Sequence, residues 1–96
     1  MTPPRPPVPK TKATKGTPLV RALELLAEGR WRPAHEIVQK DESALGAWLH
    51  GIVHTLEGDL DNARYWYKRA KREFPGAGAV KKEIAAVRLH MGGAPR

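Results

Sequence analysis

The chain has 96 residues, enough for one small domain, and its formal net charge is +7. Four of the 17 basic residues and none of the ten acidic ones lie in residues 1–17, so the rest of the chain is only mildly basic. The absence of cysteine excludes a disulfide scaffold, a cysteine-based zinc finger and a thiol nucleophile. The longest uncharged stretch, residues 43–56, is too short to cross a bilayer, and the N-terminus lacks the apolar core of a secretory signal. We therefore expect a soluble cytoplasmic protein that does not bind membranes.

Residues 1–16 have the composition of a disordered arm. They contain five prolines, and few apolar side chains that would offset the entropy lost on folding. The segment Pro6-Pro7-Val8-Pro9 allows two interpretations: a proline-rich ligand for a partner domain, or a solubilising extension. We place the folded domain at residues 17–93 and a short tail at residues 94–96.

Apolar residues recur at helical spacing through residues 17–93, and no segment has the alternation of a strand. Capping residues divide this region into five expected helices. The first is expected from Thr17-Pro18 to Gly29, the second from Pro33 to the residues before Asp41, and the third from Asp41 or Ser43 to Gly58. The fourth is expected from Asp59 to Phe74-Pro75, and the fifth from Ala79 to Met91. The sequence therefore predicts an all-α fold, arranged as two helical hairpins followed by a C-terminal capping helix.

A weak internal repeat supports this division. When the chain is offset by 29 residues, small, apolar and basic residues of the first hairpin fall on similar residues of the second. The paired positions are Glu28-Gly29 with Glu57-Gly58, Trp31 with Leu60, Ala34 with Ala63, Val38 with Tyr67, and Lys40 with Arg69.

The second unit resembles a tetratricopeptide repeat. Its small, aromatic and proline positions have that family's usual spacing: Gly51, Gly58-Asp59-Leu60-Asp61-Asn62-Ala63, Tyr67, Ala70 and Pro75. The first unit matches poorly and is about five residues short of the usual period. The resemblance implies stacked helical hairpins with a concave surface that binds a protein or peptide, and it implies no chemistry. The chain also looks like small bacterial helical proteins of unknown activity.

His50 and His54 stand where tetratricopeptide repeats usually have a large apolar residue and an aromatic one. Four residues apart, they share one face of a helix, and Glu57 continues that face. The resemblance implies that this face meets the second helix of the hairpin, which would bring further polar residues near. The ligand-binding candidates are His35, Glu36, His50, His54, Glu57, Asn62, Tyr65 and Arg69.

Three interpretations of this group stay open: a structural polar network, a site for a small ligand or substrate, and a zinc site. A histidine suits acid–base chemistry, but no activated nucleophile is recognisable, so we favour a protein that is not an enzyme. A helical pair such as His50 and His54 can bind zinc, with Glu57 as a carboxylate ligand and His35 or Glu36 of the second helix as further ligands. However, the glutamate of the metalloprotease motif is missing, because Gly51 follows His50. We expect no cofactor and no metal.

Two other surfaces are candidates for partners. In the tetratricopeptide register, Trp48 and Ile52 point toward the ligand groove and are partner-binding candidates, unless another part of the chain covers them. A basic face on the fourth helix is a candidate for nucleic acid, although nearby acidic residues interrupt it and no recognition motif accompanies it. It consists of Arg64, Lys68, Lys71 and Arg72.

The preferred function is a small helical module for protein–protein interaction that binds a peptide. The alternative is a small-ligand-binding protein or an enzyme with a polar site centred on His50 and His54 between helices. An open Trp48 face with an enclosed histidine face would favour the first function, and the reverse would favour the second.

Overall fold

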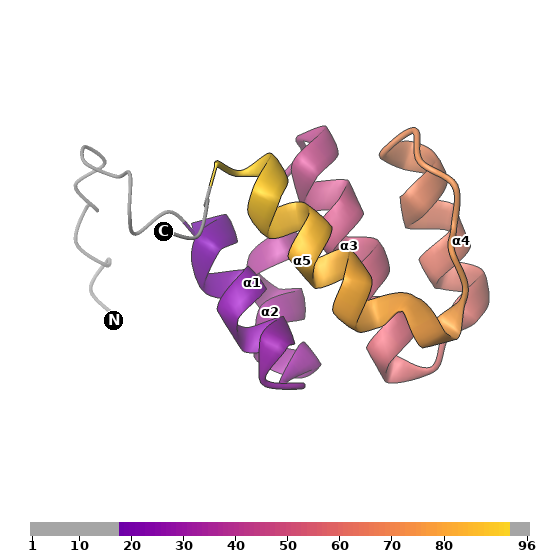
Figure 1. Ribbon diagram of the computed structural model, residues 1–96, viewed down its shortest axis with the longest axis horizontal. Coiled ribbons are helices and arrows are strands. Elements are labelled where there is room, and N and C mark those ends of the chain that lie inside the picture. The colour runs from indigo at the N-terminus through magenta and orange to yellow at the C-terminus, as the bar shows by residue number, and fades with distance from the viewer. Residues whose placement is uncertain (1–17, 93–96) are drawn as a thin grey trace, which may run out of the picture.

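The computed structural model describes residues 18–92, so the expected arm at residues 1–16 and the tail at residues 94–96 lie outside the described part. The described residues form five α-helices and one short 3-10 turn, with no strand among them, which confirms the all-α fold (Figure 1). The elements are α1 (Pro18–Ala27), α2 (Trp31–Val38), α3 (Ala44–Glu57), α4 (Leu60–Arg69), η1 (Ala77–Ala79) and α5 (Val80–His90). Among them, no helix is both long and apolar enough to cross a bilayer.

The helices pair as two hairpins with a fifth helix laid across them. α1 packs against α2, α3 packs against α4, and α2 joins the hairpins by packing against α3. α5 runs diagonally across α1 and α3, whereas α4 lies at the outer edge (Figure 1). The C-terminal helix therefore covers the surface formed by the first helices of the two hairpins.

Capping groups define both ends of α3 and the start of α4 as expected. The Ser43 hydroxyl accepts a hydrogen bond from the Gly46 N–H at 3.0 Å, and the Asp59 carboxylate accepts one from the Asn62 N–H at 3.4 Å. Gly58 ends α3 in the left-handed conformation, with φ of 93°. The expected caps Ser43, Gly58 and Asp59 are thus confirmed, whereas the expected cap Thr17 lies outside the described residues.

Two helix boundaries differ from the expected ones. α2 begins at Trp31 rather than Pro33, because proline is tolerated in the first turn, where its missing N–H has no helical partner. α4 ends at Arg69, although the apolar pattern extends to Phe74. Lys71 adopts a φ of 63°, and the N–H of the next residue bonds the Tyr67 carbonyl at 2.9 Å, which closes the helix early.

The two hairpins show the same pattern of burial at the 29-residue offset. The turn glycines both have positive φ, the paired alanines are both fully buried, and the paired apolar positions of the second helices are both in the core. These pairs are Gly29 and Gly58, Ala34 and Ala63, and Val38 and Tyr67.

The helices of the second hairpin come closest where Gly51 faces Tyr67. A Cβ atom on Gly51 would lie 2.4 Å from the Tyr67 ring and 3.4 Å from the Ala63 carbonyl oxygen. Tyr67 is 1% exposed, so its ring has little room to move away. The close contact between α3 and α4 therefore depends on the absence of a side chain at Gly51.

We expect Gly51→Ala to lower the free energy of unfolding by about 1–3 kcal/mol through overpacking, despite the better helix propensity of alanine. Urea denaturation followed by circular dichroism measures the change. The matched control is Gly78→Ala, where a Cβ would meet no atom within 4 Å. If the Gly51 variant were as stable as the control, the close packing of α3 on α4 would be wrong.

Candidate functional site

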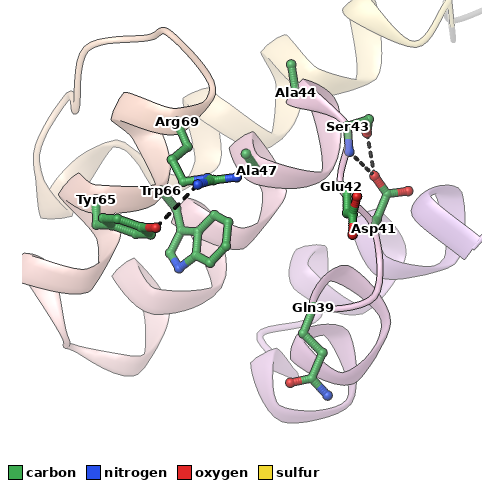
Figure 2. Close-up of a pocket in the computed structure, with 9 residues that line it drawn as sticks. All are labelled: Gln39, Asp41, Glu42, Ser43, Ala44, Ala47, Tyr65, Trp66 and Arg69. Carbon is green, nitrogen blue, oxygen red and sulfur yellow. Dashed lines mark hydrogen bonds between the residues drawn. The ribbon is translucent and has the colours of Figure 1, made fainter.

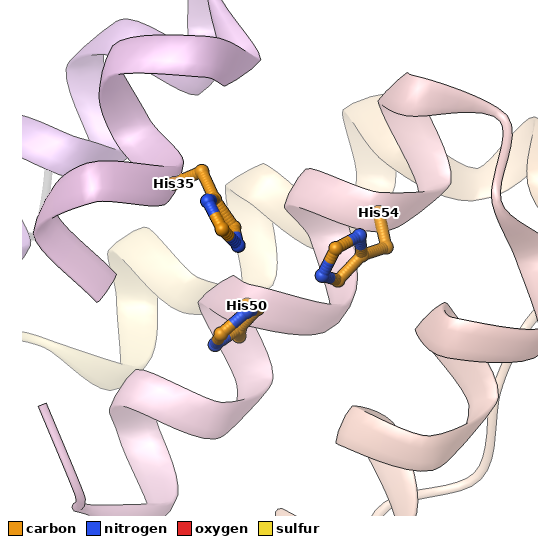
Figure 3. A group of neighbouring side chains, drawn as sticks. All are labelled: His35, His50 and His54. Carbon is orange, nitrogen blue, oxygen red and sulfur yellow. The ribbon is translucent and has the colours of Figure 1, made fainter. Parts of the chain in front are cut away.

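Three histidine rings meet where α2 of the first hairpin packs against α3 of the second (Figure 3). His35 comes from α2, and His50 and His54 come from successive turns of α3. The ring centroids are 4.9 Å apart for His35 and His50, 5.2 Å for His35 and His54, and 5.0 Å for His50 and His54. One nitrogen of each ring lies within 4.8 Å of one nitrogen of each of the others. We call these three residues the trihistidine cluster.

The neighbours of the cluster hold two of the rings in place. His50 stacks on the indole of Trp66 from α4, with ring centroids 3.8 Å apart and planes 5° from parallel. The Nδ1 atom of His54 is 2.7 Å from a carboxylate oxygen of Glu57, one turn further along α3. His54 thus has a fixed ring orientation, and its Nε2 atom remains for another partner.

Burial controls the protonation of His50, which is 5% exposed. The pKa of His50 falls to about 4, chiefly through the loss of hydration on burial, with smaller contributions from the nearby imidazoles of His54 and His35. At neutral pH this ring is therefore uncharged, with a nitrogen lone pair available to accept a hydrogen bond or to bind a metal.

Within residues 18–92, no hydrogen bond engages the ring nitrogens of His35 or His50. No fully enclosed polar side-chain atom in this part of the chain lacks a partner, so these nitrogens must keep some contact with solvent. The cluster is thus a group of electron-pair donors that a small ion can reach. A second group of possible metal ligands, which consists of His54, Glu57 and Asp59, shares His54 with the cluster.

Four of the other candidates do not join the trihistidine cluster. Glu36 is exposed, and the Asn62 amide bonds the Asp59 carboxylate at 3.2 Å. Arg69 lies over the Trp66 ring at 5.4 Å and 3.4 Å from the Tyr65 hydroxyl. The Trp66 indole thus contacts both His50, on which it stacks, and the Arg69 guanidinium.

Tyr65 and Arg69 instead line a pocket of about 550 Å³ (Figure 2). Its two walls are α4 on one side and the start of α3 with the preceding connection on the other. The lining residues are Gln39, Asp41, Glu42, Ser43, Ala44, Ala47, Tyr65, Trp66 and Arg69. One wall thus presents two aromatic rings and a guanidinium group, and the other presents two carboxyl groups.

The expectation that Trp48 and Ile52 line an open groove is wrong. They are 2% and 0% exposed, because α5 packs across α3 and covers this face. The indole N–H of Trp48 donates a hydrogen bond to Glu83 of α5 at 2.9 Å. The guanidinium of Arg72 lies 3.5 Å from the centroid of the same indole, on the face of the ring. Neither residue is available to a partner in this arrangement.

The basic face is partly engaged in contacts within the chain. Arg64 pairs with Asp61 at 3.0 Å and lies over the Phe74 ring, and Arg72 stacks on Trp48. Lys68 and Lys71 are exposed and have no acidic partner within the described residues. This leaves two free lysines rather than a continuous cationic surface, which weakens the case for nucleic acid.

Two residues that sequence reasoning did not single out prove central. Trp66 contacts both the trihistidine cluster and the pocket, and Glu83 accepts hydrogen bonds from Trp48 and, at 2.7 Å, from the Tyr67 hydroxyl. The only signal for Trp66 was its place in the aromatic run from Tyr65 to Tyr67. Nothing in the pattern distinguished Glu83 from the other charged residues of its helix.

The comparisons with known proteins found no family model, no curated protein and no solved structure that matches this chain.

Proposed function

We propose that the chain is a tetratricopeptide-like interaction module that binds a short peptide segment of a partner protein in the pocket between α4 and the α2–α3 connection. The observation that carries this proposal is the composition of the α4 wall. Tyrosine, tryptophan and arginine are the residues most enriched where binding energy concentrates in protein interfaces. Here Tyr65, Trp66 and Arg69 stand together at one concave surface. A cytoplasmic location, which the cysteine-free composition favours, belongs to the same proposal.

The packing of the second hairpin supports the family resemblance. Gly51, Ala63 and Tyr67 meet where α3 approaches α4, as expected of the small and aromatic positions of a tetratricopeptide repeat. The surface used for binding must differ from that of the family, however. α5 covers the face of α3 that holds Trp48 and Ile52, so the family's concave groove is filled by the chain's own helix.

The charges of the pocket indicate what the peptide carries. Arg69 is exposed on one wall, where its planar guanidinium suits a carboxylate. Tyr65, which is 51% exposed beside it, offers apolar surface and a hydroxyl. On the opposite wall, Asp41 is used to hold Ser43, and Glu42 is exposed without an ion-pair partner in the described region. The ligand is therefore a peptide with an acidic side chain next to an aromatic or aliphatic one.

Selection from a random peptide library on the purified full-length chain tests this function. We expect enrichment of peptides that pair an acidic residue with an apolar one. Tyr65→Ala and Arg69→Glu should each weaken binding of a selected peptide at least about tenfold, the effect of losing about 1.4 kcal/mol. Fluorescence anisotropy of the labelled peptide gives the affinities.

Two exposed residues of α5 serve as matched controls for these variants. Leu89 is 66% exposed and, like Tyr65, is one of the exposed large apolar side chains, and Arg88 is an exposed arginine outside the pocket. Leu89→Ala and Arg88→Glu should leave peptide affinity unchanged. A selected peptide that binds all four variants equally well, or a library that yields no binder, would refute a peptide site in this pocket.

A further inference from the structure

We propose that His35, His50 and His54 together bind one zinc ion, with a fourth coordination position left to water or another ligand. This site is separate from the peptide pocket and does not depend on the function proposed above. The proposal departs from the expectation of a metal-free protein. The sequence offered His35 or Glu36 only as alternative further ligands to the pair on α3, whereas the structure places the His35 imidazole beside that pair and leaves Glu36 outside the group.

The spacing of the rings is close to what a zinc ion requires. Zinc binds imidazole nitrogen at about 2.0–2.1 Å with tetrahedral geometry, which places the ligand nitrogens about 3.3 Å from one another. The three donor nitrogens already lie within 4.8 Å of one another. Side-chain rotations that move each nitrogen by about 1 Å are therefore enough to close the site, because the backbones of α2 and α3 already place the rings around a common point.

The groups around the ligands are those that support zinc-bound histidines elsewhere. A histidine bound to a metal usually has its second ring nitrogen held by a carboxylate or a carbonyl, which orients the ring and raises its basicity. The Glu57 carboxylate does this for His54, at 2.7 Å from Nδ1, and directs Nε2 to the ion. Trp66 fixes the plane of His50 by stacking on it.

Other partners do not account for the arrangement. The rings of His35 and His50 have no hydrogen bond within residues 18–92, so the structural network that would explain buried histidines is limited to His54. The neighbouring group of His54, Glu57 and Asp59 is a poorer zinc site. Its Asp59 carboxylate caps α4, and its Glu57 carboxylate is held by the His54 ring. Three nitrogen donors and an open position match the chemistry of zinc among the metals that cells supply.

Titration of the chelator-treated full-length chain with Zn²⁺ in a calorimeter tests the proposal. We expect one ion per chain, and the four-coordinate visible absorption of Co²⁺ when that ion replaces zinc. His35→Gln should weaken Zn²⁺ binding at least about 100-fold, since even the loss of a group that only supports a ligand costs about 10–100-fold. Glu57→Gln should weaken it about tenfold for that reason.

The fourth histidine provides the control. His90 is exposed on α5 and lies outside the cluster, so His90→Gln should leave zinc affinity unchanged. His35 is only half-buried, and its variant should keep the helical circular dichroism of the wild type even if a change at the more buried His50 disturbs the fold. Zinc affinity no tighter than millimolar, or a loss at His90 equal to that at His35, would overturn the proposal. Unchanged affinity in the His35 variant would overturn it as well.

Discussion

Glu83→Ala is expected to lower the free energy of unfolding by about 2–6 kcal/mol. One carboxylate oxygen of Glu83 accepts the Trp48 indole N–H at 2.9 Å and the Tyr67 hydroxyl at 2.7 Å. Both donors are almost fully buried, at 2% and 1% exposure. A buried donor left without an acceptor costs about 1–3 kcal/mol, and this substitution strands two.

The pKa of Tyr67 supports the same interpretation. Burial raises this pKa, and the hydrogen bond to the Glu83 carboxylate raises it further, so the phenol stays protonated and acts only as a donor here. Glu83 thus joins α5 to both helices of the second hairpin through a single atom. Its removal should loosen α5 and expose the Trp48 indole to solvent.

Urea denaturation followed by both circular dichroism and tryptophan fluorescence measures this effect. Lys82→Ala, at the exposed neighbouring position of α5, controls for changes in the helix itself and should cost less than about 0.5 kcal/mol. Glu83→Gln keeps an acceptor oxygen, so its loss of stability should lie between those of Lys82→Ala and Glu83→Ala. A Glu83→Ala variant as stable as the Lys82 variant would show that α5 is held by its apolar face alone.

The helices of this chain were largely predictable because their signals are local. Ser43, Asp59 and Gly58 act within one turn of their own positions, and helical spacing of apolar residues depends only on the adjacent sequence. The early end of α4 shows the limit of this reasoning. Phe74 continues the apolar pattern, but the backbone turns at Lys71 and Phe74 packs against Tyr67 from the following segment instead.

The position of α5 was not predictable from its pattern. An apolar stripe shows that a helix is amphipathic, and it does not show which surface the stripe covers. Placing α5 as a cap at the end of the array left Trp48 and Ile52 open, whereas α5 lies across α1 and α3 and buries them. Trp48 and Ile52 are buried, but so are His50 and His54, so the structure meets neither of the two conditions set for choosing between the functions. Because the Trp48 face is closed, the peptide-binding surface proposed here lies elsewhere.

The sequence named His35, His50 and His54 as candidates for one site, but it predicted a shared surface only for the two residues on one helix. His50 and His54 are four residues apart, so their common face follows from helix geometry. The approach of His35 depends on how α2 packs against α3, which sequence spacing cannot give. Trp66 was missed for the same reason. It contacts both His50 and Arg69, which belong to two different places, the trihistidine cluster and the pocket, that the sequence had merged into one site.

Acid should destabilise the metal-free protein through His50. The pKa of this ring falls from 6.5 to about 4 on folding, chiefly by burial, with smaller contributions from His54 and His35. Between these two pH values the unfolded chain binds the proton and the folded chain does not, so stability falls as the pH is lowered from 6.5 toward 4. The free energy of unfolding should fall by about 3 kcal/mol, because each pH unit between the two pKa values contributes 1.36 kcal/mol.

The test compares the wild type with His50→Phe, which keeps a flat ring against Trp66 and removes the titrating group. Both proteins are unfolded with urea at several pH values from 7 to 4, with a chelator present because a bound metal would compete with the proton for the same nitrogen. The charged and titratable groups near this ring are His35 from α2, and His54 and Glu57 from α3. The variant retains these groups, so the comparison isolates the contribution of His50. The free energy of unfolding of the wild type should fall by about 3 kcal/mol more than that of the variant over this pH range.

Parallel pH profiles for the two proteins would mean that His50 takes up its proton in the folded state as readily as in the unfolded one.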